Sequence, residues 1–426
     1  MIRVLVKNLV QLMNDYDRDV TETGPADQHT VRRHNCALVL STIAAFPGVS
    51  RAGVAAHTGL TKATVSSLVD RLVTTSLVRE EGLQHRRGPG RRGTSLSLSP
   101  HGPHGLGVEI AVDYITTYLV NLTGDVCDER VRRVDNRGRP VDEVLARVER
   151  EANDALERAR RNGITVGGIG VAVPGLVEAA NGLVRTAPNL GWHDVDLTSE
   201  LSRRVPVPFG ELVVGNEADL AAVAELSALR HGADTALDSF VYVSGEIGIG
   251  AGIVLDGELF RGTHGFGGEL GHFPVQPRGP RCSCGARGCL ERLAGQDAIL
   301  DRAHVEDVDT LLDRLDEHDR AALTAVRSAG RVLGTALSGV VNLLDISTIV
   351  LGGTFALLHP WLVEPLRTEL TGRVVSTPWR AVEVRRSVVG AEAAVRGAAL
   401  SALRTILIDP AAYISRLPAR QALSSG

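Results

Sequence analysis

Three of the five cysteines of this chain lie within eight positions, in the segment RCSCGARGCLE at residues 281–291. Cys282, Cys284 and Cys289 are separated by glycines and small residues that allow a short loop to fold around an ion. His272 lies ten residues before the first of these thiols. Three thiolates and one imidazole form a tetrahedral ligand set that is typical of structural zinc. A disulfide across one intervening residue would be strained and would leave a thiol unpaired, so the spacing favours a metal site over redox chemistry.

The composition is that of an ordinary globular protein. The chain is 44% hydrophobic and 23% charged. Its length of 426 residues indicates two or three domains. An uninterrupted apolar run of about 18 residues is absent, so we expect no membrane span. The N-terminus lacks the small-residue cleavage site of a secretory signal, and we expect a cytoplasmic protein with reduced thiols. Cys36 and Cys127 stand alone, and we predict that both are core residues.

Charge is distributed unevenly along the chain. The net charge is −4, yet residues 31–100 contain ten Lys or Arg against three Asp or Glu, a balance of +7 that leaves −11 for the remainder. A basic module attached to an acidic body suggests that the module meets a polyanion. A solvated basic face is the alternative that charge alone leaves open.

The basic module has the pattern of a helix-turn-helix. Residues 31–46 have helical apolar spacing. Ser50 is the expected N-cap of a short helix, Gly59 can adopt the left-handed turn, and Thr61 is the expected N-cap of a second helix. The second helix carries apolar residues at helical spacing, namely Val65, Leu68, Val69 and Leu72. Two helices joined in this way indicate the helix-turn-helix motif.

Polar and basic residues of the module are candidates for contact with DNA. On the helices they are Arg51, Thr61, Lys62, Thr64, Ser66 and Ser67. Such side chains near the start of a recognition helix can reach base edges or phosphates in the major groove. The tip HRRGPGRRG between two expected strands holds Arg86, Arg87, Arg91 and Arg92, which fit a wing along the phosphate backbone or in the minor groove. An ordinary helical hairpin is the alternative, and the basic tip and charge asymmetry favour DNA binding over it.

Strands alternate with helices after Leu106, which predicts an α/β body. Strands are expected within 106–126, 167–177, 205–216, 239–262 and 347–352, and helices over 141–163, from 217, from 354 and over 391–406. Four glycines lie between apolar residues in 239–262, namely Gly245, Gly248, Gly250 and Gly252. Such glycines let a backbone approach a phosphate closely, but they also occur in tight turns, so alone they are a weak signal.

Four segments together resemble one family, the ROK family of repressors, open reading frames and kinases. They are NEADLAAVAE at 216–225, GEIGIGAGIVLDGELFRG at 245–262, GGELGH at 267–272 and RCSCGARGCLE at 281–291. The likeness runs from about residue 31 to about 405, and the helix-turn-helix before the body resembles the repressor branch. It implies a two-lobed actin/hexokinase-like fold with a sugar in the cleft. The division we expect is an N-terminal extension (1–30), a winged helix-turn-helix (31–100) and a body (104–426) whose lobes are 104–215 with 391–406, and 216–390.

The resemblance also implies a site. The zinc ligands would be His272, Cys282, Cys284 and Cys289. The sugar contacts would be Asn189, Asn216, Glu269, His272 and Glu291, with Glu217 at the position of the kinases' general base. Zinc would fix the loop that carries Glu291, which would couple metal binding to ligand recognition.

Three departures from the kinase pattern argue against phosphoryl transfer. Glu217 replaces the catalytic Asp, which displaces the carboxylate by one methylene, and Asp219 replaces the motif's second Asn. The segment EIAVDY at 109–114 lacks the glycines, Thr and Lys of the first phosphate loop, and Glu246 adds like charge to the second. We therefore expect no kinase activity and no catalytic residue.

The sequence thus predicts a sugar-responsive transcription factor, most simply a repressor of carbohydrate-metabolism genes. It would bind operator double-stranded DNA and a sugar or sugar derivative, carry structural zinc and form a homodimer or homotetramer. An ATP-dependent sugar kinase with a DNA-binding appendage is the main alternative. A zinc-stabilised sugar-binding protein without a DNA function is the third.

Overall fold

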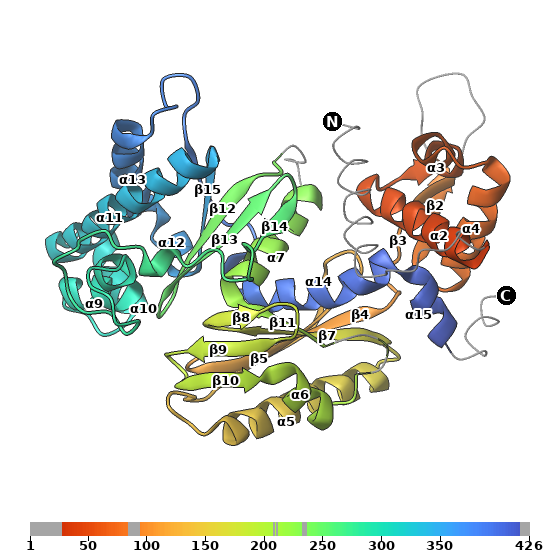
Figure 1. The fold of residues 1–426 in the computed structure, drawn as a ribbon, viewed down its shortest axis with the longest axis horizontal. Helices are drawn as coiled ribbons and strands as arrows, with labels where there is room; N and C mark the ends of the chain where they lie inside the picture. The colour runs from red at the N-terminus through yellow and green to blue at the C-terminus, as the bar shows by residue number, and fades with distance from the viewer. Residues whose placement is uncertain (1–27, 84–93, 208, 210–211, 232–236, 418–426) are drawn as a thin grey trace.

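The computed structural model describes residues 28–83, 94–207, 209, 212–231 and 237–417 (Figure 1). The four arginines of the expected wing tip and almost all of the N-terminal extension lie outside the described residues. Within the described ranges, no helix is both long and apolar enough to cross a membrane. The chain forms a small N-terminal module beside a body of two lobes, each built on its own five-stranded sheet.

The N-terminal module contains three helices and a three-stranded sheet. They are α2 (Gln28–Ala45), α3 (Arg51–Thr58) and α4 (Lys62–Thr74), with β1 (Val49–Ser50), β3 (Thr94–Leu98) and β2 (Val78–Leu83) in that sheet order. The Ser50 side chain accepts a hydrogen bond from the Gly53 amide, and the Thr61 side chain accepts one from the Thr64 amide. Gly59 ends α3 with φ at 74°. The predicted helices, caps and turn are therefore confirmed.

The first lobe is a mixed sheet covered by helices. Its strands lie in the order β11 (Leu212–Asn216), β7 (Val166–Val173), β4 (His104–Ile110), β5 (Tyr114–Val120) and β6 (Val126–Arg133). The helix α5 (Val141–Arg161) buries Val144, Leu145 and Val148 against this sheet. Cys127 is exposed, so its prediction as a core residue is wrong, because β6 is an edge strand with one open side. Cys36 is buried as predicted.

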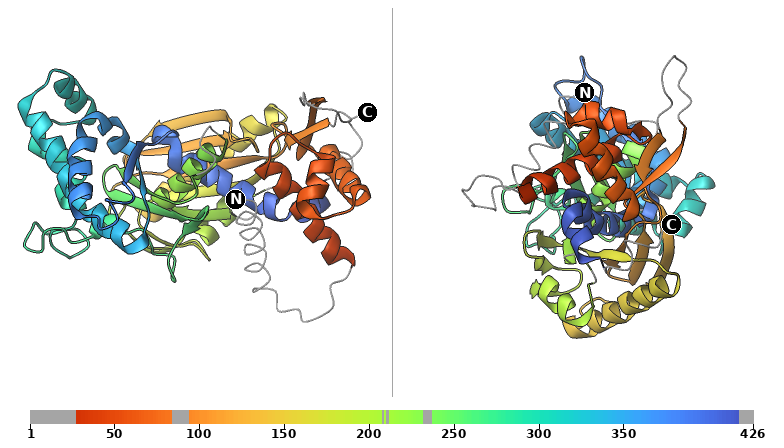
Figure 2. Two further views of the ribbon diagram at one scale, coloured as in Figure 1. Left: turned by 90° about the horizontal axis from the view of Figure 1, so that it is seen from above. Right: turned by 90° about the vertical axis from the view of Figure 1, so that its right-hand side faces the viewer.

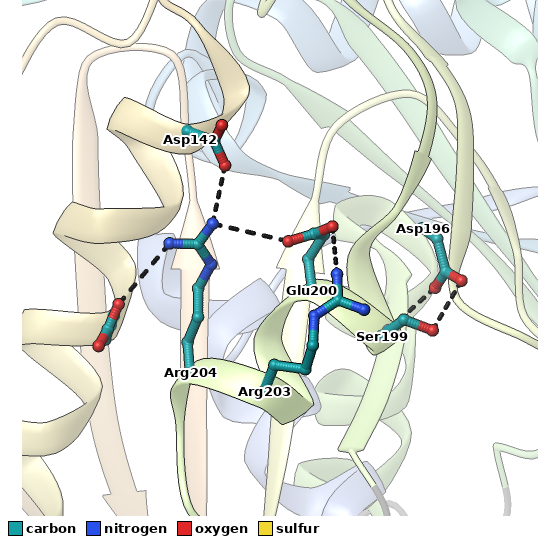
Figure 3. Close-up of polar contacts among 7 residues, drawn as sticks. Asp142, Asp196, Ser199, Glu200, Arg203 and Arg204 are labelled. Atoms are coloured by element: carbon teal, nitrogen blue, oxygen red, sulfur yellow. Dashed lines mark hydrogen bonds and ion pairs between the residues drawn. The ribbon is translucent and has the colours of Figure 1, made fainter.

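A smaller sheet and a short helix complete the first lobe. The sheet contains β10 (Trp192–Asp196), β9 (Leu183–Ala187) and β8 (Leu176–Glu178), and the helix is α6 (Leu197–Arg204). Ion pairs join α6 to α5: Arg204 lies 2.7 Å from Asp142 and 3.8 Å from Glu149 (Figure 3). Asp196 caps α6 by accepting hydrogen bonds from the amide and hydroxyl of Ser199.

The second lobe contains the other five-stranded sheet and half of the α-helices in the described residues. The strand order is β14 (Glu258–Phe260), β13 (Ile249–Leu255), β12 (Phe240–Gly245), β15 (Thr348–Gly352) and β16 (Glu383–Arg386). The helices are α7 (Glu217–His231), α8 (Glu291–Ala294), α9 (Gln296–Ala303), α10 (Val308–Asp316), α11 (Arg320–Leu344), α12 (Gly353–Leu357) and α13 (His359–Arg373). The apolar faces of α9, α11 and α13 bury one continuous core against the sheet.

The helix α14 (Ala393–Ile408) lies between the first lobe's sheet and α7 (Figure 1). The approach is backbone to backbone, and only glycine permits it. A Cβ on Gly105 would lie 2.1 Å from the Ala399 carbonyl oxygen, and one on Gly397 would lie 1.7 Å from the Leu220 carbonyl oxygen. Because these contacts leave no space for a side chain, α14 packs tightly against both neighbours.

The C-terminal helices also pack on the N-terminal module. Leu403 and Ile406 of α14 and Tyr413 of α15 (Pro410–Arg416) belong to the same buried cluster as the apolar residues of α2 and α4. Arg33 on α2 forms an ion pair with Asp409. The core of the N-terminal module is therefore completed by α14 and α15, which lie beside it (Figure 2), a packing that the sequence did not indicate.

Candidate functional site

The four expected metal ligands meet on one loop. The imidazole of His272 and the thiols of Cys282, Cys284 and Cys289 place their ligand atoms within 4.8 Å of one another. The Cys282 thiol lies 3.7 Å from the His272 Nδ1, and Cys284 lies 3.7 Å from Cys289. Two ligands of a tetrahedral ion with zinc–sulfur bonds of about 2.3 Å would lie about 3.8 Å apart, so these side chains fit zinc.

Glycines shape the loop that carries the thiols. Gly285 and Gly288 have φ of 90° and 68°, which L side chains rarely adopt. A Cβ on Gly288 would lie 1.6 Å from the Gln276 carbonyl oxygen. The loop is closed by a hydrogen bond in which the Cys282 amide donates to the Ala286 carbonyl. Its turns thus bring the thiols together.

A cavity of about 700 Å³ lies beside this loop and is lined by residues of both lobes. Its wall contains all six residues that the family resemblance assigned to sugar binding: Asn189, Asn216, Glu217, Glu269, His272 and Glu291. We call the side formed by Glu269, His272 and Glu291 the metal end. Glu291 begins α8 two residues after Cys289, and its carboxylate lies 4.0 Å from the Cys282 thiol. The metal loop therefore fixes the position of a cavity-lining carboxylate.

Asn216 uses its side chain within the protein. Its amide nitrogen donates to the Gly175 carbonyl at 2.9 Å. Its amide oxygen accepts from the amides of Ala218 and Asp219, which caps the first turn of α7. Asn216 thus holds the start of α7 against the first lobe, in addition to lining the cavity.

Another part of the cavity wall also carries carboxylates, and we call it the acidic end. Asp113, Tyr114 and Glu246 line it, and Glu109 lies behind Tyr114, whose hydroxyl donates to the Glu109 carboxylate at 2.8 Å. Burial, followed by the charge of Glu246, raises the pKa of Glu109 well above its usual range. Burial and the charge of Asp113 raise the pKa of Glu246 to about 7.

Glu217 lies between the two ends. Burial is the main cause that raises the pKa of Glu217 to about 8. Like charge adds to that rise, from Glu246 on one side and from Glu269 and Glu291 on the other. Carboxyl groups in such surroundings are partly neutral near pH 7, and a neutral carboxyl can donate as well as accept a hydrogen bond.

The glycines of the β12–β13 hairpin have packing partners that explain them. A Cβ on Gly250 would lie 2.7 Å from the Ala218 Cβ, and one on Gly245 would lie 2.6 Å from the Phe355 ring. These residues allow α7 and α12 to approach the hairpin. Their presence therefore gives no independent evidence for a bound phosphate.

The predicted DNA-contacting residues differ in exposure. Thr61, Lys62 and Ser67 are exposed around the first two turns of α4, whereas Thr64 and Ser66 are half-buried. Arg51 is engaged within the module, because its guanidinium lies 2.7 Å from Asp70 and 2.8 Å from Glu80 and also donates to the Ser66 carbonyl. The structure thus gives Arg51 a role in holding α3, α4 and β2 together.

Several cavity-lining residues were not predicted. Asp219, Gln296, Thr354 and Arg386 come from four different elements or loops. Only Asp219 had a signal in the sequence, since it lies three residues after Asn216 in a motif already identified. The others are brought to the cavity by long-range packing.

Two family models match the chain. The model described as ROK family matches residues 105–405, and the model described as MarR family matches residues 32–88. The Xylose repressor of Bacillus subtilis is 31% identical over 389 residues, which cover 90% of this chain and 97% of that protein.

Solved structures share the fold. A crystal structure described as a ROK family transcriptional regulator, homolog of the E. coli MLC protein, matches with a TM-score of 0.74 and 26% identity over 92% of this chain and 99% of that one. A ROK family glucokinase from Streptomyces griseus, in complex with glucose and AMPPNP, matches with a TM-score of 0.62 and 24% identity over 71% of this chain and 99% of that one. The kinase-like match thus covers the body, and the regulator-like match covers almost the whole chain.

Proposed function

The chain belongs to the ROK family, and from this premise we propose that it is a sugar-responsive transcriptional repressor that binds its effector without phosphorylating it. The observation that carries the proposal is the joining of a winged helix to a metal-braced cavity whose other end is acidic. Carboxylates repel the phosphates of a nucleotide, whereas carboxylates and amides suit the hydroxyls of a sugar.

His272, Cys282, Cys284 and Cys289 would hold the zinc ion, which supplies a fixed cross-link for the loop. Glu269 and Glu291 would accept hydrogen bonds from sugar hydroxyls at the metal end. Asn189 would complete the cavity wall from the first lobe, and Asn216 would fix the turn that carries Glu217. We assign these residues to effector binding because they share one cavity wall.

Coupling between effector and DNA would run through α14. The segment before it, which includes Val389 and Gly390, lines the cavity, and its other end completes the core of the winged helix. Because α14 is pressed between the first lobe and α7, closure of the lobes would move the winged helix as well. To change operator occupancy, the effector must bind one arrangement more tightly than the other.

The recognition surface would be the exposed part of α4, with Lys62 and Ser67 facing DNA. Arg86, Arg87, Arg91 and Arg92 would follow the phosphate backbone from the wing. A homodimer or homotetramer would place two such modules on a palindromic operator, as in other helix-turn-helix proteins.

The test is DNA binding by the metal-loaded full chain, measured by fluorescence anisotropy on the DNA upstream of its own gene at several salt concentrations. Replacement of the four wing arginines by Ala is expected to weaken binding at least tenfold at about 0.15 M salt and to flatten the salt dependence. Arg327→Ala is the matched control, because Arg327 is an exposed arginine on α11 of the second lobe. A sugar that raises the melting temperature should change the DNA affinity several-fold.

Equal DNA affinity for the wing variant and the control would contradict the proposal. The kinase alternative has its own test, an ATP-coupled assay with magnesium and a panel of hexoses and amino sugars. Turnover that Glu217→Ala abolishes would establish a kinase instead.

A further inference from the structure

Asp219 lines the cavity and has a buried carboxylate oxygen without a hydrogen-bond partner. It lies in the first turn of α7, lines the cavity and is 6% exposed. Among the described residues, its Oδ1 is a buried side-chain oxygen without a hydrogen-bond partner. Buried carboxylate oxygens are costly unless they are hydrogen-bonded, so an unpaired one on a cavity-lining residue suggests a partner that arrives with a ligand.

Neighbouring residues fix the position of Asp219 but give its Oδ1 no hydrogen-bond donor. Its backbone amide donates to Asn216, which fixes the start of the helix. Its Oδ2 lies 3.9 Å from the Arg261 Nε, close enough for attraction but too far for a hydrogen bond. Glu269 adds like charge, and burial is the main cause that raises the pKa of Asp219 to about 7. A hydrogen-bond donor from a ligand would replace the solvation that the buried carboxylate lacks.

We propose that Asp219 Oδ1 accepts a hydrogen bond from a hydroxyl or ammonium group of the effector, and that Asp219 is a specificity-determining residue of the cavity. Arg261, whose Nε lies 3.9 Å from Oδ2, is a positioning residue for this carboxylate. The inference rests on the proposed function, since it takes the cavity to be the effector site. The effector class is a polyhydroxy or amino-polyhydroxy compound, because its hydroxyl or ammonium groups supply the donor that a carboxylate oxygen accepts.

A purely structural role is the alternative to exclude. An acid in the first turn of a helix interacts favourably with the helix dipole, so Asp219 could serve α7 alone. A structural role predicts that replacement weakens all ligands equally. A recognition role predicts that replacement removes the preference for one particular hydroxyl or amino group and leaves the other preferences intact.

The test is calorimetric titration of the metal-loaded full chain with D-xylose, D-glucose and D-glucosamine, followed by the monodeoxy analogues of the tightest binder. The wild type should bind one analogue at least tenfold more weakly than the parent, the size expected for a hydrogen bond to a charged group. Asp219→Ala should bind the parent and that analogue equally, and Asp219→Asn should retain part of the preference. Asp313→Asn, an exposed acid on α10, is the control.

The outcomes separate this inference from the proposed function. If the wild type binds none of these compounds, the proposed function fails and the inference with it. If the wild type binds and Asp219→Ala retains the full set of preferences, or loses affinity for all analogues by the same factor, only the inference is overturned. Far-ultraviolet circular dichroism and melting temperature establish that the variants are folded.

Discussion

The two ends of the cavity are built on different elements and carry different chemistry. At the metal end, the thiol loop fixes Glu291, and Glu269 lies 3.9 Å from the His272 ring. At the acidic end, the hairpin glycines of the expected phosphate loop are present, but Glu246 and Asp113 occupy the space around them. Gly245, Gly250 and Gly252 pack against α12 and α7, so their presence follows from the fold whether or not a nucleotide binds.

This difference teaches that backbone and side chains constrain function separately. A glycine that allows two elements to approach cannot be replaced without moving them, so it persists when the chemistry changes. A side chain that only faces a cavity can be exchanged at little cost to the fold. For this cavity, the side chains therefore give better evidence of function than the glycines do.

The largest effect should come from dismantling the metal end. Cys284→Ser should remove or loosen the metal and weaken sugar binding by about 100-fold, because the loop that fixes Glu291 would lose its cross-link. Cys284 is exposed, so the change costs little packing. Metal content by mass spectrometry and sugar affinity by calorimetry check the prediction.

Cys127→Ser is the control for that experiment, since Cys127 is an exposed thiol on β6 far from the cluster. Sugar affinity equal to wild type in a metal-free Cys284→Ser protein would remove the proposed link between metal and effector.

A smaller effect is expected on stability when pH changes, because the carboxyl groups of Glu217 and Glu246 titrate. The pKa values of Glu217 and Glu246 in the folded protein are about 8 and about 7, above the usual 4.5. Between pH 4.5 and 8 the folded state therefore binds more protons than the unfolded state, and the free energy of unfolding falls as pH rises. The melting temperature of the sugar-free, metal-loaded protein should drop by several degrees from pH 6 to 8.5.

Glu217→Gln and Glu246→Gln should each flatten this dependence, whereas Glu364→Gln should leave it unchanged, because Glu364 is exposed on α13. Parallel pH profiles for wild type and both cavity variants would show that these carboxyls are solvated rather than buried.

Local signals explain what the sequence could predict. Ser50, Gly59 and Thr61 mark helix ends through contacts within a few residues, so the helix-turn-helix was predictable from spacing alone. The metal ligands likewise lie within one short loop. The cavity wall followed from the family resemblance, because its residues come from distant segments that no local pattern connects.

Long-range packing explains what was missed. The strand β6 carries mostly charged residues on an edge, so it lacks the alternation that indicates a strand, and Cys127 on it was wrongly placed in the core. The partners of Arg51 come from two other elements, α4 and β2. The packing of the C-terminal helices on the winged helix brings together segments more than 300 residues apart, as the Arg33–Asp409 pair shows.

The smallest effect should come from neutralising the acidic end while sugar binding is measured. Glu246→Gln keeps the size of the side chain and removes a carboxyl whose neighbour is Asp113, so sugar affinity should change less than about threefold, within the range of a weak, indirect interaction. Glu291→Gln should weaken sugar binding at least tenfold in the same calorimetric titration, because a direct hydrogen bond to a charged group is lost. The contrast is informative because both residues line one cavity and both changes are isosteric. If Glu246→Gln weakened binding as much as Glu291→Gln, the effector would contact both ends of the cavity. The assignment of sugar recognition to the metal end alone would then be wrong.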